Sequence, residues 1–222
     1  MKKNQYNKDI NKMKKTNKAN LLIILLFLTS VTNAYNLRQL SNKEGLSNSA
    51  ILSICQDNER FTWIGTADGL NMYNGAEIHI FKPEINPLGS LSGNLIEEVW
   101  EGEHGIIWIN TNHGLNRYNK KTKEIESYDE FEGKYFWTKT SRNEIFVINE
   151  NNRINYYDRH QKKFIPIALP GIIKDDIRRV FIDKSDLLWI ITNKSVIHTI
   201  KISFESNTPA FSHVNDFIHD CG

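Results

Sequence analysis

A 15-residue pattern recurs 45 residues further along this chain. The first copy is FTWIGTADGLNMYNG at 61–75, and the second is IIWINTNHGLNRYNK at 106–120. In both copies a tryptophan stands six residues before a Gly-Leu-Asn triplet. An internal repeat with a period of about 20 to 50 residues is typical of small structural units that stack on one another. The sequence therefore predicts an array of similar units and not one irregular core.

Two more divergent copies continue the array. The unit that begins at Ile177 keeps the spacing around Trp189 but has Ser-Val in place of Gly-Leu. In the unit between, Val147 stands at the tryptophan place, and RINYYD at 153–158 stands where the first copy has GLNMYN. Successive anchor positions are then 45, 39 and 42 residues apart. This spacing is typical of one four-stranded propeller blade.

Each unit has the pattern of strands joined by short turns. Apolar and polar residues alternate in ILSICQD and IRRVFID, and branched and aromatic residues dominate FTWIGT and LLWIIT. Asn, Asp, Gly and Lys stand at the joins. The tryptophans are expected to fill the space between adjacent blades. The prediction is an all-β fold, a β-propeller with four-stranded antiparallel blades at about 51–81, 96–128, 135–167 and 177–213.

Single strands are predicted at both ends of the array. YNLRQL at 35–40 resembles the fourth strands and is expected to be an outer strand without a blade of its own. VNDFIHD, within 214–222, repeats the apolar spacing of a first strand and is expected to start the next blade. These two strands would lie about 14 Å apart in one blade, because two strands are missing between them. Residues 35–222 are therefore predicted to form four blades plus the first strand of a fifth, as a partial β-propeller in an incomplete ring.

The first 34 residues have the pattern of a secretory signal. Seven lysines precede the apolar run 21–28, and Thr32 and Ala34 are the small residues that a signal peptidase reads. This pattern predicts a signal peptide over 1–34, cleaved between Ala34 and Tyr35, and a periplasmic or extracytoplasmic protein. An uncleaved anchor is the alternative, although the apolar run is shorter than the roughly 20 residues that span a bilayer.

Two cysteines, Cys55 and Cys221, would lie in an oxidising compartment after export. A disulfide between them is one reading. The other is that Cys55, inside the apolar strand pattern ILSIC, is a small buried thiol.

The sequence contains no recognisable catalytic or metal-binding pattern. The histidines show no HExxH spacing, the cysteines no CxxC spacing, and Gly-x-Ser-x-Gly is absent. We therefore predict no catalytic residue, no metal site and no cofactor, and the ligand-binding residues stay unassigned. Residues after 34 carry 21 basic and 25 acidic side chains without a basic stripe, which argues against a nucleic acid partner.

The segments 51–74 and 96–119 resemble the two-component regulator propeller repeat. Its pattern runs from an apolar-x-x-apolar strand through an acidic turn to Leu-Trp-Ile-Gly-Thr and Gly-Leu-Asn-Arg-Tyr-Asp. Asn110 and Ile191 replace the glycine of that pattern in the second and fourth units, and the third unit lacks both Trp and Gly-Leu. Such repeats are typical of the periplasmic sensor half of hybrid histidine kinases in Bacteroidetes-like bacteria.

The resemblance implies the N-terminal part of a ligand-sensing propeller. Its ligand would be an oligosaccharide or another nutrient, and its partners would be the downstream propeller blades and the kinase of a full-length protein in the inner membrane. A homodimer through the full-length sensor is also implied. The chain alone would have no signalling activity and would not be an enzyme.

Two other functions remain open at the level of sequence. The chain could belong to an exported propeller enzyme that acts on polysaccharides, such as a lyase or hydrolase, or to a secreted binding scaffold. The loops between the predicted blades are short and carry no clustered His, Asp, Arg and Tyr set, which disfavours the enzyme.

Overall fold

The computed structural model describes residues 39–84, 89–131, 135–149, 153–167, 177–205 and 208–218, together with the isolated residues 13, 15 and 20. The chain divides into two units, Met1–Gln39 and Leu40–Gly222, and the account below concerns the second. Apart from those isolated residues, the predicted signal peptide lies outside the described residues, as does most of the strand expected at 35–40. The described residues of that strand, Gln39 and Leu40, lie in no strand. Within the described part of the chain, no helix is long and apolar enough to cross a membrane.

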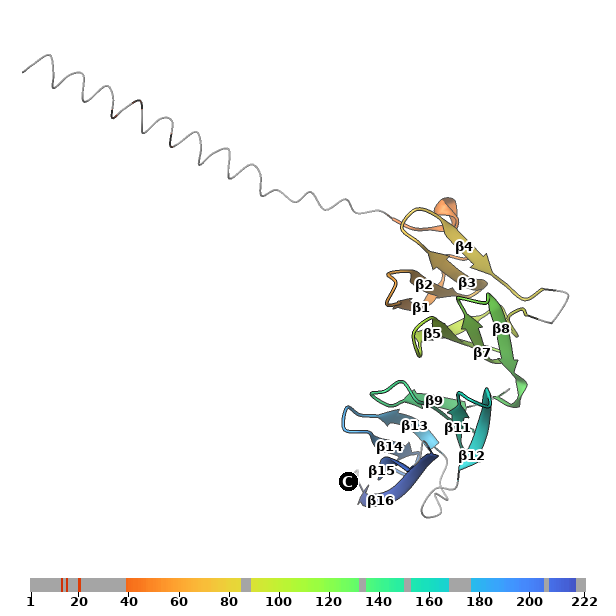
Figure 1. The fold of residues 1–222 in the computed structure, drawn as a ribbon, viewed down its shortest axis with the longest axis vertical. Coiled ribbons are helices and arrows are strands. Elements are labelled where there is room, and N and C mark those ends of the chain that lie inside the picture. The colour runs from red at the N-terminus through yellow and green to blue at the C-terminus, as the bar shows by residue number, and fades with distance from the viewer. Residues whose placement is uncertain are drawn as a thin grey trace, which may run out of the picture. The chain divides into compact units, whose positions relative to one another are not determined.

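Four antiparallel four-stranded sheets follow one another along the chain, each with its strands in sequence order (Figure 1). We call them blades 1 to 4. Blade 1 contains β1 (Ile51–Gln56), β2 (Thr62–Thr66), β3 (Gly69–Tyr73) and β4 (Ile78–Phe81). Blade 2 contains β5 (Ile96–Glu101), β6 (Ile106–Thr111), β7 (Gly114–Asn119) and β8 (Glu124–Tyr128). Blade 3 contains β9 (Tyr135–Lys139), β10 (Ile145–Asn149), β11 (Ile154–Asp158) and β12 (Lys163–Ile167). The 3₁₀ turns η1 (Asn42–Glu44) and η2 (Asp129–Phe131) precede blades 1 and 3. The prediction of four-stranded antiparallel blades is confirmed.

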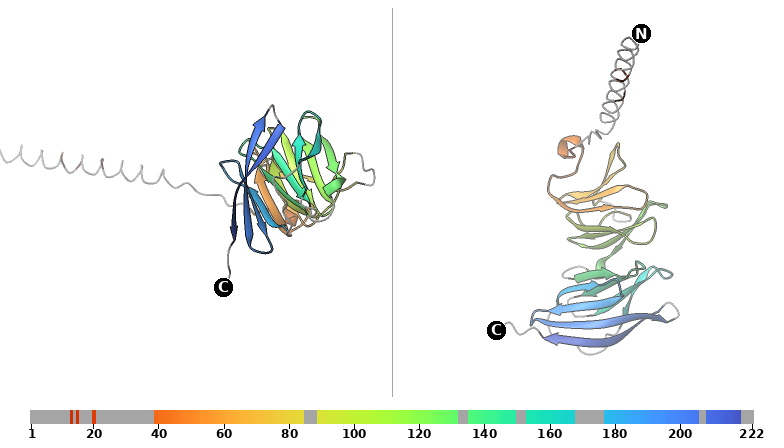
Figure 2. Two further views of the ribbon diagram at one scale, coloured as in Figure 1. Left: turned by 90° about the horizontal axis from the view of Figure 1, so that it is seen from below. Right: turned by 90° about the vertical axis from the view of Figure 1, so that its left-hand side faces the viewer.

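Blade 4 differs from the prediction at its outer edge. It contains β13 (Ile177–Ile182), β14 (Leu187–Thr192), β15 (Val196–Glu205) and β16 (Thr208–Ile218). Figure 2 shows β15 and β16, in blue, as a long hairpin. They pair from Val196 opposite Ile218 to Glu205 opposite Thr208, so residues 214–218 belong to the fourth strand of blade 4 and not to a fifth blade. The ten residues of β15 need an equally long partner, and the apolar spacing of VNDFI fits an outer strand as well as a first strand.

Among the described residues the apolar core forms three clusters, one between each pair of consecutive blades. Trp63 of blade 1 is fully buried against blade 2, in the cluster that contains Ile107 and Ile109. Trp108 of blade 2 is fully buried against blade 3, in the cluster that contains Val147 and Tyr157. Both tryptophans therefore fill the space between adjacent blades, as the repeat predicts.

In blade 3 the tryptophan place belongs to Phe146 and not to Val147. Phe146 packs in the cluster shared with blade 4, which is the direction in which Trp63 and Trp108 face their own next blades. Val147 lies on the opposite face, in the cluster shared with blade 2. A shift of one residue along a strand reverses the face of every side chain, so the expected anchor was one position too late.

The asparagine of the Gly-Leu-Asn triplet is a structural residue. Asn71 is fully buried, accepts a hydrogen bond from Ser47 N at 2.9 Å and donates to Ser47 Oγ at 2.8 Å. Asn116 makes the same two bonds to Ser92, at 2.9 and 2.8 Å. The repeat therefore begins upstream of the first strand, at the Leu-Ser pairs 46–47 and 91–92, which sequence analysis had not included.

Candidate functional site

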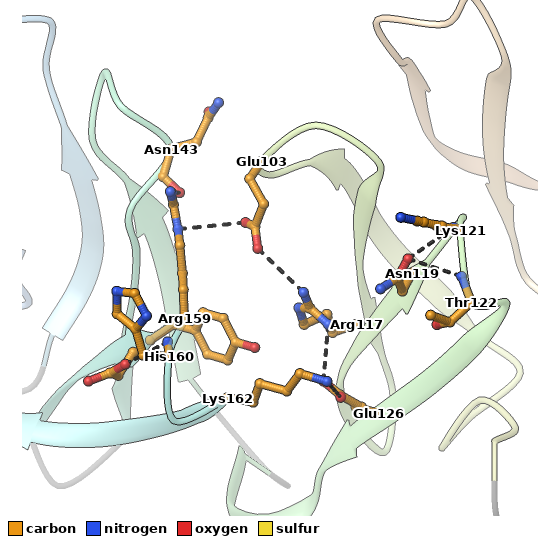
Figure 3. Close-up of polar contacts among 12 residues, drawn as sticks. Glu103, Arg117, Asn119, Lys121, Thr122, Glu126, Asn143, Arg159, His160 and Lys162 are labelled. Carbon is orange, nitrogen blue, oxygen red and sulfur yellow. Dashed lines mark hydrogen bonds and ion pairs between the residues drawn. The ribbon is translucent and has the colours of Figure 1, made fainter.

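Charged side chains of blades 2 and 3 gather where the first-to-second and third-to-fourth strand turns of these blades meet (Figure 3). Arg117 on β7 lies between Glu103 and Glu126, with Nη2–Oε1 and Nη1–Oε2 distances of 3.4 and 3.2 Å. From blade 3, Arg159 Nε lies 3.8 Å from Glu103 Oε2, and Lys162 Nζ lies 3.3 Å from Glu126 Oε1. We call these five residues the charged cluster. They link two blades by ion pairs.

Arg117 is the buried centre of this cluster, with a side chain only 9% exposed. Its guanidinium carbon lies 5.8 Å from the centroid of the Tyr157 ring. Burial by itself would lower the pKa of Arg117, but Tyr157 and the two glutamates outweigh burial and raise it. Among the described residues, Arg117 Nε has no hydrogen-bond partner. Arg117 is therefore a cation fixed in position by carboxylates on both sides.

A cavity of about 350 Å³, which we call the blade 3–4 cavity, lies beside the cluster. Tyr156 and Phe204 contribute aromatic rings whose centroids are 6.3 Å apart, at an angle of 60°. The Arg142 guanidinium carbon lies 5.4 Å from the centroid of the Phe204 ring. The remaining lining residues are polar: Glu144, Asp158, Arg159, His160 and Thr208. This cavity combines an apolar surface with hydrogen-bonding groups of both charges.

Arg159 connects the blade 3–4 cavity to the charged cluster. Its Nη2 donates to the carbonyl oxygens of Arg142 and Asn143, at 3.2 and 2.9 Å, while its Nε faces Glu103 (Figure 3). One guanidinium therefore contacts the β9–β10 turn, which lines the cavity, and the β5–β6 turn of blade 2. A displacement of Arg159 in the cavity would act on both turns.

A second cavity, of about 540 Å³, lies between blades 1 and 2. Its central cation, Lys120, is paired with Asp57 at 2.6 Å and with Glu59 at 3.2 Å. His104 Nε2 lies 3.7 Å from Glu59 Oε1 on the same rim. Most of its charged groups are thus engaged with one another, in contrast to Arg142 in the blade 3–4 cavity.

The other residues considered from sequence do not contribute to these sites. Cys55 is half-buried, and burial raises the pKa of its thiol. Its pairing with Cys221 stays a prediction, because Cys221 lies outside the described residues. Over the ranges that the structure describes, no group of three His, Cys, Asp or Glu side chains could hold a metal ion.

Sequence analysis assigned no ligand-binding residue and missed Arg117. One signal was available. The second repeat reads GLNRY where the first reads GLNMY, so an arginine occupies the position of the apolar Met72. Arginine is also the residue of the Gly-Leu-Asn-Arg-Tyr-Asp pattern at this position, so Met72 is the departure, and a charged residue on an inner strand indicates a partner of opposite charge.

Comparison with known proteins agrees with this fold. The model of the two component regulator propeller family matches residues 45–68, which confirms the resemblance for the first repeat. The extracellular domain of a hybrid two component system of B. thetaiotaomicron is similar in structure, with 24% identity and a TM-score of 0.52, over 79% of this chain and 31% of that one. The extracellular domain of a one component system of B. thetaiotaomicron has 17% identity and a TM-score of 0.57, over 81% and 27%.

An enzyme has the same architecture. Virginiamycin B lyase from Staphylococcus aureus has 19% identity and a TM-score of 0.53, over 78% of this chain and 56% of the lyase. Identities this low establish the β-propeller fold and nothing finer. The chain spans about a third or less of the two extracellular domains. Among curated proteins, none matches the sequence significantly.

Proposed function

We propose that this chain supplies blades of the extracytoplasmic sensor region of a two-component system, and that its role is to bind a ligand. The observation that carries this proposal is the family match at residues 45–68, in a fold shared with the extracellular domains of such systems. The basic and apolar N-terminal sequence supports export. Further blades, a kinase, an inner-membrane location and a homodimer belong to the same proposal.

The ligand is an oligosaccharide or another small nutrient, bound at the blade 3–4 cavity. Its volume, about 350 Å³, falls at the lower end of the range of about 300–1,000 Å³ that ligand pockets occupy. Aromatic rings beside imidazole, hydroxyl, carboxylate and guanidinium groups are suited to a molecule with both apolar and hydroxyl-bearing faces. Because Arg159 contacts both the cavity wall and Glu103, occupancy of the cavity would act on the contact between blades 2 and 3.

Isothermal titration calorimetry of the purified chain against a panel of oligosaccharides, monosaccharides and amino acids tests this function. We expect saturable binding of at least one saccharide, weakened by Tyr156→Ala. The matched control is Tyr73→Ala, because Tyr73 lies on blade 1 and away from the cavity. If only amino acids bind, the ligand is not a saccharide. If no compound of the panel binds, ligand binding by this chain is contradicted.

The same samples distinguish a sensor from a polysaccharide lyase or hydrolase. Mass spectrometry of the saccharide after prolonged incubation should show the starting material only. Accumulating fragments whose amount scales with protein concentration would favour the exported enzyme, the alternative that the sequence leaves open. A scaffold without a small ligand would show neither heat of binding nor products.

A further inference from the structure

We infer that the blade 3–4 cavity selects a saccharide that carries a carboxylate, with Arg142 as the residue that binds the carboxylate. This inference rests on the proposed function and names the class of ligand for the same site. It follows from the way in which the charges around the cavity are already paired.

Arg142 differs from the other arginines of this region in having no carboxylate partner. Arg117 lies between two glutamates, and Arg159 faces Glu103. The guanidinium of Arg142, in contrast, makes no ion pair with any residue that the structure describes, and its one recorded contact is the face of the Phe204 ring. A guanidinium offers donors in a planar fork that matches the two oxygens of a carboxylate. Arg142 is thus an unused carboxylate-binding group at the cavity wall.

Arg142 is an exposed residue with one contact at its backbone carbonyl and one at its guanidinium. Its backbone carbonyl accepts a hydrogen bond from Arg159 at 3.2 Å, and its guanidinium rests on Phe204. A side chain that is already ordered loses less conformational freedom when it binds a ligand. The contact with Phe204 therefore limits the orientations of a guanidinium that stays exposed and open to a ligand.

The other lining groups favour a saccharide over a simple anion. Glu144 accepts a hydrogen bond from Thr140 Oγ1 through Oε2, and its Oε1 has no recorded partner among the described residues. That oxygen can accept a hydrogen bond from a sugar hydroxyl, a donor that a fully ionised simple anion does not offer. Tyr156 and Phe204 provide the apolar surface on which the C–H face of a sugar ring packs.

The acidic residue on the far rim does not compete for Arg142. Asp158 accepts hydrogen bonds from the backbone N–H groups of His160 and Gln161, at 2.8 and 3.0 Å, and from the Gln161 side chain at 3.1 Å. Its carboxylate closes the β11–β12 turn. The cavity therefore presents Arg142 and Glu144 at separate points, one for a carboxylate and one for a hydroxyl.

A matched pair of disaccharides tests the inference on the full chain. Digalacturonic acid and the neutral digalactose of the same linkage differ only in their carboxylates. By calorimetry we expect the acidic disaccharide to bind about tenfold more tightly or better, because a charge-assisted bidentate contact to a carboxylate is stronger than a contact between neutral groups. Arg142→Gln should remove this preference, because it lowers the affinity for the acidic disaccharide about tenfold more than the affinity for the neutral one. Arg178→Gln, an exposed arginine of β13 outside the cavity, should change neither.

The outcomes separate this inference from the proposed function. Equal affinity for both disaccharides, or an acidic preference that survives Arg142→Gln, would overturn the role of Arg142 and leave a sensor of neutral sugars. Displacement of the acidic disaccharide by millimolar inorganic phosphate would show a simple anion site and also overturn it. Binding of no saccharide by the folded chain would contradict both proposals. If Arg142→Gln unfolds by circular dichroism, Arg142→Lys replaces it, with the expectation that the acidic preference falls because the fork is lost.

Discussion

Asp57 should contribute more to stability than its counterpart in blade 4. Asp57 has a fully buried side chain and accepts hydrogen bonds from Trp63 Nε1 at 2.9 Å, from Glu59 N at 2.9 Å and from Phe61 N at 3.0 Å. The ammonium group of Lys120 lies 2.6 Å from the same carboxylate. Four donors therefore depend on one carboxylate that fastens the β1–β2 turn to the tryptophan anchor.

Asp183 provides the matched comparison. It bonds Trp189 Nε1 at 2.9 Å, Ser185 N at 2.8 Å and Leu187 N at 3.1 Å, so the turn and the tryptophan bond are the same. It differs in being only partly buried and in having no lysine within ion-pair distance among the described residues. If substitution of Asp57 lowers the free energy of unfolding more than substitution of Asp183 does, the difference comes from the buried ion pair and from the burial of the turn.

The expected magnitudes follow from the groups that are left without acceptors. Asp57→Ala should lower the free energy of unfolding of blade 1 by about 3–5 kcal/mol, the range for breaking one partner of a buried ion pair. Asp183→Ala should lower that of blade 4 by about 1–2 kcal/mol, because water can reach the freed donors. The loss at Asp57 is partly offset because Lys120 retains Glu59 at 3.2 Å.

The losses of unfolding free energy in both variants can be measured by hydrogen exchange of the β2 and β14 amides. Urea denaturation, followed by tryptophan fluorescence, is measured on the same samples. Lys120→Met completes a double-mutant cycle with Asp57→Ala, and the coupling between the two changes should be about 1–3 kcal/mol. If Asp57→Ala costs no more than Asp183→Ala, or if the coupling is near zero, the ion pair does not stabilise blade 1 and this reasoning is wrong.

Acidification should reproduce part of the effect. Burial opposes ionisation of Asp57, but hydrogen bonds from Lys120, Trp63 and Phe61 outweigh it and hold the pKa below the ordinary aspartate value. A carboxylate with a lowered pKa in the folded state stabilises the fold above its unfolded pKa, at about 4. That stabilisation is lost as the pH falls through the lower, folded-state pKa. Wild-type blade 1 should therefore lose stability below about pH 4, and Asp57→Ala should show a flatter profile over the same range.

Three further predictions concern the packing and hydrogen bonds of blades 1 and 2. Gly65→Ala should lower the free energy of unfolding by about 1–3 kcal/mol, because the added Cβ would lie 2.8 Å from Ile96 Cγ2 and 3.1 Å from Ile96 O. Urea denaturation measures this loss. Val99 is only 4% exposed, so Val99→Lys should lower the free energy of unfolding by more than about 4 kcal/mol or prevent folding. Ile54, at the equivalent position of blade 1, is 64% exposed. Ile54→Lys should therefore change the free energy of unfolding by no more than about 0.5 kcal/mol and should reduce self-association in analytical ultracentrifugation. Asn116→Ala should raise amide exchange at the start of blade 2 and cost about 2–3 kcal/mol, because a buried backbone donor and carbonyl lose their partner; unchanged exchange would assign the asparagine no structural role.

The repeat could be predicted from the sequence because every blade has the same local strand and turn pattern. The strand pattern, the turn that follows each first strand and the tryptophan between blades depend on residues within about 20 positions of one another, and these recur with the period. The errors lie where the local pattern is ambiguous. VNDFI alternates like a first strand and like an outer strand, and only its pairing with β15 decides between them. Phe146 and Val147 are both apolar neighbours, and the register of β10 decides which one faces blade 4.

The candidate site was not readable, because its members belong to different repeats. Glu103 and Arg159 meet only when blades 2 and 3 stack, and Arg142 and Phe204 only when blades 3 and 4 do. Periodicity within a repeat carries no information on which turns of neighbouring blades face each other, or on the charges that meet there.

One position of the repeat nevertheless connects the anchors to the site. The residue directly opposite the anchor on the third strand is Met72 in blade 1, Arg117 in blade 2, Tyr156 in blade 3 and Thr199 in blade 4. In blade 1 this position packs in the core, in blade 2 it centres the charged cluster, and in blade 3 it lines the cavity. The anchor beside it is constrained because it must fill the space between blades, whereas this position can vary without loss of the fold. Exchange of Tyr156 for other side chains should therefore change which ligand binds before it changes whether blade 3 folds.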